Sequence, residues 1–172
     1  MTSKDLCKHL NPLSSKERSD ALLRCCGSSK WASLLNKQFP FSEDQELYDT
    51  ATSIWGTMER EDILEAFSHH PQIGADPEAL RQKFKTTHSW SSNEQAGMSS
   101  ASEDCIADLA QCNKIYLERF GYIFIVCATG KTAAQMLSII QQRLNNQEEQ
   151  ELKIAAAEQG KITLLRLHKL TE

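Results

Sequence analysis

The amino-acid sequence predicts an all-α fold, a single-domain bundle of about eight helices with one short extended segment. Apolar residues recur at helical spacing through most of the chain. Spacings typical of helix capping boxes come before several of these runs, at Ser14, Ser42, Ser100 and Thr132. Only residues 122–128 have the composition of a buried strand, and no second stretch resembles a partner for them. We therefore expect helices and no sheet.

The expected helices follow in order, each from its own signals. In the first half of the chain, Gly27 is expected to end the first helix. Phe39-Pro40-Phe41 is expected to end the second helix, and a short break near Arg60 to separate the third helix from the fourth. Asp76 is a good N-cap with Pro77 at the first helical position of the fifth. These helices cover about residues 14–26, 30–37, 42–58, 61–67 and 76–87.

In the second half, Ser100-x-x-Glu103 is expected to open the clearest helix, and Gly121 to close it. Residues 122–128 then form the extended segment, which we expect to be buried among helices. The last two helices are expected at about 132–144 and 148–170, with Leu152, Ala155, Ile162, Leu165 and Arg166 along the final one.

Composition excludes several classes of function. The chain has 172 residues, enough for one domain with a core, and a net charge of −4, with no basic stripe for nucleic acid. Its longest apolar run is too short to cross a membrane, and the first residues lack the apolar core of a signal peptide, so we expect a cytoplasmic protein. The six cysteines show no C-x-x-C spacing, which favours reduced, buried thiols over disulfides or a metal site.

A histidine pair before a proline is the first candidate for chemistry. His69 and His70 follow a helical pattern, and Pro71 disfavours helical geometry at His70. Gly74 is expected to let the chain turn toward the next helix. A histidine on such a corner suits proton transfer, because its pKa lies near neutrality. A His-Pro pair can also simply end a helix.

Three further places carry polar groups. Residues 91–95 (Ser91-Ser92-Asn93-Glu94-Gln95) have capping-box spacing, and a helix N-terminus also presents free N–H groups to an anion. A turn follows the extended segment at Thr129-Gly130-Lys131. Arg166 lies among leucines, where its guanidinium either faces solvent or needs an anionic partner.

Two other function classes remain open on the residues alone. A metal-dependent hydrolase would recruit His69, His70 and His88 with a cysteine or Glu94, although the spacing matches no zinc template. A non-enzymatic helical interaction module would instead present an exposed apolar groove. Residues 128–132 lack the first glycine of a phosphate-binding loop, which argues against nucleotide binding.

Taken in order, four motifs closely resemble one family, 2-oxo-4-hydroxy-4-carboxy-5-ureidoimidazoline (OHCU) decarboxylase. The resemblance covers nearly the whole chain, as a single domain over residues 1–172. It rests on His70-Pro71 with Ile73-Gly74, Ser91-x-x-Glu94-Gln95-x-Gly97, Glu118-Arg119-Phe120-Gly121-Tyr122-x-Phe124-x-x-Cys127-Ala128, and Leu165-Arg166-Leu167-His168.

The resemblance implies an all-helical homodimer that needs no cofactor and converts OHCU to (S)-allantoin and CO2, the last step of urate oxidation. It also implies that His70 is the catalytic histidine and that Glu94 works with it. The residues implied to bind substrate are Pro71, Ser91, Ser92, Asn93, Glu94, Gln95, Val126, Cys127, Ala128, Thr129, Gly130 and Arg166. The distance along the chain from His70 to Glu94 is longer than in animal members, so the loop holding Ser91 is expected to have a different shape.

Overall fold

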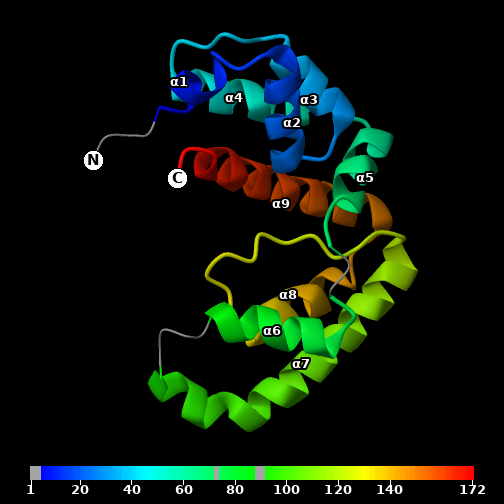
Figure 1. Ribbon diagram of the computed structural model, residues 1–172. Coiled ribbons are helices and arrows are strands. Elements are labelled where there is room, and N and C mark those ends of the chain that lie inside the picture. The colour runs from blue at the N-terminus through cyan, green and yellow to red at the C-terminus, as the bar shows by residue number, and fades with distance from the viewer. Residues whose placement is uncertain (1–4, 72–73, 88–91) are drawn as a thin grey trace. The chain divides into compact units, whose positions relative to one another are not determined.

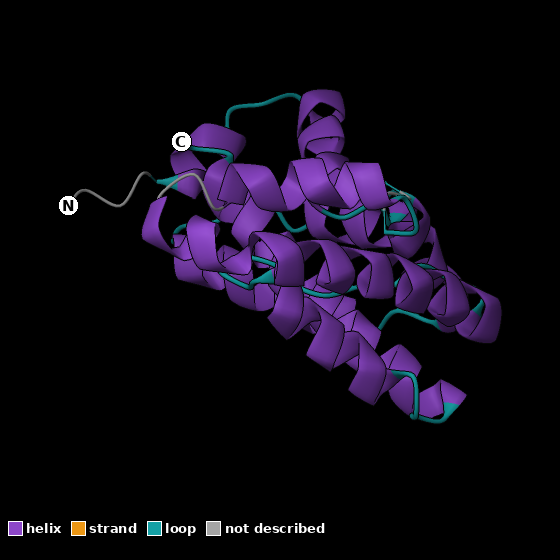
Figure 2. Ribbon diagram, turned by 90° about the horizontal axis from the view of Figure 1, so that it is seen from below, coloured by secondary structure: helices purple, strands orange, loops and turns teal. Residues whose placement is uncertain are grey.

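The structure is a computed structural model that describes residues 5–71, 74–87 and 92–172, and the side chains at positions 83, 85–87 and 92–102 lie outside that description. All regular elements of the described chain are α-helices, with no strand among them, which confirms the predicted fold class (Figure 2). The helices are α1 (Leu6–Leu10), α2 (Ser15–Cys25), α3 (Ser29–Asn36), α4 (Asp44–Trp55), α5 (Arg60–Ser68), α6 (Pro77–Thr87), α7 (Ser92–Phe120), α8 (Ala133–Arg143) and α9 (Glu148–Lys169).

The contacts of the chain group into two compact units. The first unit contains the described part of residues 1–70 together with residues 156–172, and the second contains the described part of residues 71–155. Helix α9 begins in the second unit and continues into the first. The single domain expected over residues 1–172 stays a prediction. In the part of the chain that the structure describes, each helix is too short or too polar to span a lipid bilayer.

The first unit consists of α1 to α5 and the C-terminal part of α9 (Figure 1). Apolar side chains of these helices and of the segments between α2, α3, α4 and α5 form a large buried core. Trp31 on α3 is fully buried, and its indole Nε1 donates a hydrogen bond to the Ala51 carbonyl of α4 (3.0 Å). Trp55 at the end of α4 donates in the same way to the Ala156 carbonyl of α9 (2.8 Å). Each indole thus packs its apolar ring against the core, fully buried for Trp31 and half-buried for Trp55, while its one polar atom is satisfied, which ties α3 to α4 and α4 to α9.

Helix α1 was not expected from the sequence, and its partner explains why. The Asp44 carboxylate of α4 accepts hydrogen bonds from the backbone N–H groups of Leu6 (2.9 Å) and Cys7 (2.8 Å). Asp5 caps the next N–H, that of Lys8 (3.1 Å). A five-residue helix cannot stabilise itself alone, so a side chain distant in sequence completes its first turn. Asp44 is itself the first residue of α4, so this helix begins after Ser42, the start that the sequence predicts.

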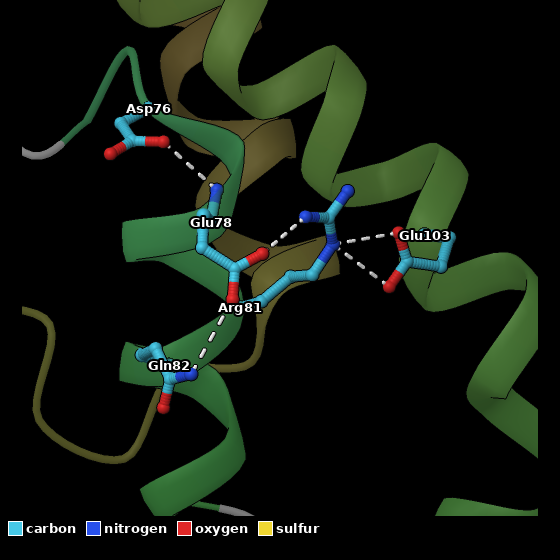
Figure 3. Close-up of polar contacts among 5 residues, drawn as sticks. All are labelled: Asp76, Glu78, Arg81, Gln82 and Glu103. Carbon is cyan, nitrogen blue, oxygen red and sulfur yellow. Dashed lines mark hydrogen bonds and ion pairs between the residues drawn. The ribbon is translucent and has the colours of Figure 1, made fainter.

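In the second unit α7 packs against both α6 and α8. The predicted start of α6 is confirmed: Asp76 accepts from the backbone N–H of Glu78 (3.0 Å), and Pro77 is the first helical residue. Arg81 of α6 then donates to Glu103 of α7 (2.8 Å to Oε2) and to Glu78 (2.8 Å), as Figure 3 shows. The predicted start of α7 at Ser100 was wrong, because the helix already begins at Ser92.

The extended segment after α7 is present, but it is less buried than expected. Gly121 closes α7 with a φ of +81°, the left-handed conformation that glycine adopts without strain. Tyr122 and Ile125 are buried, whereas the other residues of 122–128 are only half-buried. The two buried positions are three residues apart, so their burial does not follow the simple alternation of a strand covered on one face.

The line of buried residues along α9 differs from the line of apolar residues that the sequence suggests for this helix. Fully or nearly fully buried positions recur every fourth residue: Glu151, Ala155, Gln159, Thr163 and Leu167. Among the residues expected along this helix, Leu165 is 37% exposed. Three of the five buried positions are polar, so a search for apolar spacing does not find this line.

Candidate active site

The His-Pro corner forms as predicted, at the end of α5. The helix ends at Ser68, and the N–H groups of His69 and His70 make tight turn bonds to Ala66 O (3.3 Å) and Phe67 O (3.1 Å). Glu65, one turn before the corner, accepts from the N–H (2.7 Å) and hydroxyl (2.6 Å) of Ser29, which fixes α5 to the start of α3. The corner is therefore attached to the core of the first unit.

The two histidines of the corner have different surroundings. The His69 ring is exposed and lies against Gly27, so closely that a Cβ at Gly27 would collide with it. The His70 ring is half-buried, and its Nε2 lies 2.5 Å from Oε1 of Gln159 on α9. Of the two imidazoles, His70 is thus the one with a buried hydrogen-bond partner. Pro71, the next residue, is exposed and belongs to the second unit.

Gly74 has a different role from the one expected. Its φ is not positive; the described glycines with positive φ are Gly121 and Gly130. Instead, a Cβ at Gly74 would lie 2.6 Å from Oδ1 of Asn113 on α7, well inside van der Waals contact. The glycine leaves room for the Asn113 side chain close to the backbone, and its φ shows that the turn itself does not depend on a left-handed conformation.

Arg166 lies on the face of α9 that carries the buried polar line, one turn beyond Thr163, and its side chain is half-buried. Its charge acts on two buried thiols of α2, Cys25 and Cys26. Burial raises the pKa of Cys25 to about 12 despite the opposing effect of Arg166, so the thiol stays neutral. All six cysteines are free thiols; Cys7, Cys25 and Cys26 are buried as predicted, whereas Cys105, Cys112 and Cys127 are only half-buried.

The stretch of residues 91–95 is described only in part. Ser91 and His88 lie outside the described residues. The backbone of Ser92, Asn93, Glu94 and Gln95 forms the first turn of α7, while their side chains lie outside the description. The helical start at Ser92 agrees with the capping-box spacing of Ser91 and Glu94. Their roles in catalysis and binding remain predictions.

Arg143 and Lys131 donate hydrogen bonds to carbonyl groups in and next to the turn at residues 126–130. Arg143 of α8 donates from Nη1 to Ile125 O (2.7 Å). Lys131 donates from Nζ to Cys127 O (2.7 Å) and from its backbone N–H to Ala128 O (3.0 Å). Gly130 supplies a φ of +75° at the tip. A trans peptide places its N–H opposite its C=O, so the N–H groups that follow these carbonyls point away from Arg143 and Lys131.

A buried ionic cluster fixes Arg143 in this position. Its Nε donates to Oε1 of Glu151 (2.6 Å), and its guanidinium lies 4.6 Å from the Phe124 ring centroid. Tyr116 donates to the same Glu151 oxygen (2.6 Å), and Asn146 donates to the other (3.0 Å). Burial, with the hydrogen bond to Glu151, raises the pKa of Tyr116, so the phenol stays protonated and continues to donate.

Comparison with known proteins identifies the family. The family model for OHCU decarboxylase matches residues 11–168, nearly the whole chain. The chain belongs to the OHCU decarboxylase family.

Individual relatives agree with this assignment. Over 148 residues the chain is 41% identical to an Arabidopsis thaliana protein described as a bifunctional uric acid degradation protein, covering 85% of this chain and 45% of that one. A mouse OHCU decarboxylase is 33% identical over 131 residues, covering 76% of this chain and 72% of its own. The chain therefore spans less than half the length of the bifunctional relative.

A solved structure of the family supports the fold as well. An OHCU decarboxylase crystallised in the presence of (S)-allantoin is 39% identical and superimposes with a TM-score of 0.70. The match covers 88% of this chain and 97% of that one. The all-α architecture is thus shared over nearly the full length of this family member.

Sequence reasoning missed the residues that hold the candidate site groups in place. Gln159 contacts His70, Arg143 holds the carbonyl of Ile125, and Lys131 holds that of Cys127. Thr163 and Glu151 complete the contacts of Gln159 and Arg143. Polar residues at four-residue spacing within α9 were the available signal for Glu151, Gln159 and Thr163, but only burial distinguishes them from a solvated face.

Proposed function

We propose that this chain is an OHCU decarboxylase, which converts OHCU to (S)-allantoin and CO2 in the degradation of urate without a cofactor. The observation that carries the proposal is the family match over residues 11–168, which includes the His70 corner, the start of α7, the 126–130 turn and Arg166. The family member crystallised with (S)-allantoin supports the same substrate class.

The reaction needs few chemical groups. When the C–C bond to the carboxylate breaks, CO2 leaves and its electron pair stays on the ring carbon. Neighbouring carbonyl and imine groups delocalise that pair, so no metal or pyridoxal is required. The protein has to orient the carboxylate, stabilise the developing anion and deliver one proton to one face of the ring carbon.

His70 is the proposed proton donor. It lies half-buried on a corner fixed to the core, where its Nε2 is hydrogen-bonded to Gln159. Glu94 is the proposed partner that favours the imidazolium, the form of the ring that can donate. Proton delivery from a fixed position to one face explains why the product would be a single enantiomer.

Binding is proposed to fall to the remaining site residues. The N–H groups of Val126, Ala128 and Thr129 point away from the donors that hold their neighbouring carbonyls, and their proposed role is to donate to an anionic group of the substrate. The planar fork of Arg166 matches a carboxylate or ureido oxygen. The other proposed binding residues are Pro71, Ser91, Ser92, Asn93, Glu94, Gln95, Cys127 and Gly130.

We also propose that the chain works as a homodimer, as its resemblance to the family implies. Light scattering coupled to size-exclusion chromatography tests this. A mass of twice that of the 172-residue chain is expected, and a monomeric mass at micromolar concentration would contradict it.

The decisive experiment follows the chirality of the product. Freshly generated OHCU is supplied to the purified protein, and the circular dichroism of the allantoin formed is recorded over time. OHCU decays spontaneously to racemic allantoin, so enzyme action appears as an excess of the S enantiomer. Racemic product formed at the spontaneous rate would refute the proposed function.

Variants of the proposed proton-transfer pair test the mechanism. His70→Asn and Glu94→Gln should each reduce enantioselective turnover by about 10²–10⁴-fold, the usual worth of general acid–base assistance. The double variant should lose little more than either single one, because both groups serve one proton transfer. His69→Asn is the matched control, since that exposed ring should leave much of the rate. If His70→Asn is as active as His69→Asn, the assignment of His70 is wrong.

A further inference from the structure

Lys131 lies at a place where helix stability does not favour a positive charge. It follows the turn at residues 126–130 and comes directly before Thr132, the N-cap of α8. Its backbone is fixed on both sides: its N–H donates to the carbonyl of Ala128 (3.0 Å), and a capping box with Gln135 holds Thr132. The positive end of the helix dipole lies at the start of α8, where a cation is unfavourable. The stability of α8 therefore does not explain a lysine here.

The Lys131 side chain folds back onto the backbone that precedes it. Residues 128–131 form a turn closed by the N–H of Lys131, and Gly130 at its third position has a φ of +75°, as a type II turn requires. The lysine side chain is half-buried, and its Nζ donates to the carbonyl of Cys127 (2.7 Å). A lysine ammonium more commonly extends into water, so this contact fixes a group that is otherwise mobile.

The ammonium of Lys131 acts on this peptide without an anionic partner in the described chain. Among the residues that the structure describes, Lys131 makes no ion pair with a carboxylate. Its 2.7 Å contact with the Cys127 carbonyl has the length of a charge-assisted hydrogen bond, which is stronger than a bond between neutral groups. The positive charge therefore acts mainly on one peptide group.

A cation on a carbonyl also changes the N–H group of the same peptide. The charge draws electron density toward the oxygen and away from the nitrogen, so the N–H becomes a better donor. In the peptide between Cys127 and Ala128, this N–H belongs to Ala128 and points away from Lys131, because a trans peptide places N–H opposite C=O. Within the described part of the chain, the Ala128 N–H has no hydrogen-bond acceptor. Ala128 thus offers a strengthened donor to a ligand.

The same arrangement occurs two residues earlier. Arg143 donates to the carbonyl of Ile125 (2.7 Å), and the N–H of that peptide belongs to Val126. The Val126 N–H also lacks an acceptor among the residues that the structure describes. A single contact of this kind can arise from packing alone. Its repetition at alternate peptides of the segment proposed to bind substrate favours a role in binding.

We propose that Lys131 is a positioning residue that acts through the carbonyl of Cys127, orienting and strengthening the N–H of Ala128 as a donor to an anionic oxygen of the substrate. This inference rests on the proposed function, in which residues 126–130 bind OHCU. The lysine itself does not touch the substrate in this arrangement. A neutral side chain at position 131 would leave the Ala128 N–H an ordinary amide donor.

The effect on the peptide can be measured without substrate. Backbone NMR spectra of the labelled full-length protein report the amide 1H and 15N shifts of Ala128 and the carbonyl 13C shift of Cys127. In Lys131→Met all three should move upfield, because a hydrogen bond to the carbonyl deshields these nuclei. Lys131→Arg keeps a cationic donor and should stay close to wild type. Lys153→Met, which removes the same charge from an exposed position of α9, is the matched control. Equal shifts of Ala128 in Lys131→Met and Lys153→Met would overturn the proposal.

Binding then separates a positioning role from a purely structural one. In folded samples with unchanged far-UV circular dichroism, Lys131→Met should raise the KM for OHCU and the Kd for (S)-allantoin by about three- to tenfold, with little change in kcat, because a donor to the bound ligand has become weaker. Lys131→Arg should restore most of both values. If the lysine only stabilised the fold, its loss would lower kcat through a smaller active fraction and leave the Kd as in wild type.

The remaining outcomes assign each failure to one hypothesis. If wild type makes (S)-allantoin but Lys131→Met keeps the KM and Kd of wild type, the inference fails while the proposed function stands. Weaker binding in Lys131→Met with an unchanged Ala128 amide would mean that the ammonium contacts the ligand directly, which also overturns the positioning role. If wild type makes only racemic product, the proposed function itself fails.

Discussion

His69 and His70 show how strongly the surroundings of a side chain decide its use. They are adjacent in sequence, yet one ring lies exposed against Gly27 and the other meets a buried amide. The half-buried ring has a defined hydrogen-bond partner, which is what directional proton transfer requires. The role proposed for Arg166 also depends on a single side chain, because it requires the planar shape of the guanidinium.

Arg166→Lys should weaken binding of (S)-allantoin by about tenfold or more while leaving the fold intact. Lysine keeps the charge but loses the planar pair of donors, and a hydrogen bond to a charged group is worth roughly 1.5–3 kcal/mol. Isothermal titration calorimetry with (S)-allantoin measures the change. Arg24→Lys, at an exposed position of α2, is the control and should bind as wild type. Equal affinities for Arg166→Lys and wild type would place Arg166 outside the site.

At the scale of elements, two parts of the fold depend on side chains far away in sequence. Helix α1 has only five residues, and Asp44 on α4 completes its N-terminus. The segment between α7 and α8 has no sheet partner in the described chain, and Arg143 holds its Ile125 carbonyl instead. In both cases a side chain supplies the hydrogen bonds that a longer helix or a sheet would supply from the backbone.

Asp44→Asn should destabilise the fold by about 1–2 kcal/mol at neutral pH, as loss of a helix cap does. Asparagine offers one acceptor oxygen where two N–H groups need partners. Burial alone would raise the pKa of Asp44, but the hydrogen bonds from Cys7 and Leu6 outweigh it, so the pKa is lowered. The carboxylate therefore stabilises the fold above the usual carboxyl pKa of about 4, and this contribution is lost as the pH falls through the lowered value.

Urea unfolding of wild type and Asp44→Asn at several pH values measures this. The difference in unfolding free energy should be constant from pH 7 to about pH 5 and narrow below about pH 4. Asp49→Asn, an exposed position on the same helix, is the control and should change little. A difference that grows on acidification would contradict the role assigned to Asp44.

Arg143→Met should destabilise the fold by about 3–5 kcal/mol, because it leaves Glu151, which is 0% exposed, without its cation. It should also raise the KM for OHCU, since the carbonyl of Ile125 loses its donor. Adding Glu151→Gln should recover part of the stability by removing the uncompensated charge, while the KM stays high. Thermal unfolding and steady-state kinetics give the two readouts. Equal stability of the single and double variants would argue against the buried ion pair.

At the scale of the whole molecule, each compact unit contains its own buried contacts. The first has a large apolar core with two satisfied tryptophans, and the second has the Arg143–Glu151 cluster between α7, α8 and the start of α9. The candidate residues are distributed over both units: His70 and Arg166 belong to the first, and residues 126–130 to the second. The reaction proposed for them draws on protein groups alone.

Prolonged dialysis against EDTA should accordingly leave the formation of (S)-allantoin unchanged. In the proposed mechanism the ring of the substrate delocalises the electron pair, and His70 supplies the proton, so no step uses a metal ion. A metal-dependent hydrolase built on the same histidines would lose its activity and regain it when Zn²⁺ is added. Loss of activity in EDTA with recovery in Zn²⁺ would therefore refute the metal-independent mechanism.

Features that depend on neighbouring residues could be predicted from the sequence. The capping boxes at Ser14 and Thr132, the start of α6 at Pro77 and the end of α7 at Gly121 all follow local rules of helix capping, and the structure confirms them. The His-Pro corner formed for the same reason. The family could be recognised because its motifs are short and occur in a fixed order along the chain.

Features that depend on partners distant in sequence required the tertiary structure. The sequence alone determined an all-helical chain with a histidine at a helix end, because helix hydrogen bonds and caps join residues a few positions apart. Only the tertiary structure decided that Asp44 completes α1, that Arg143 holds the segment before α8, and that Gln159 faces His70. These contacts join residues many positions apart, and which polar side chains become buried together depends on how the helices pack.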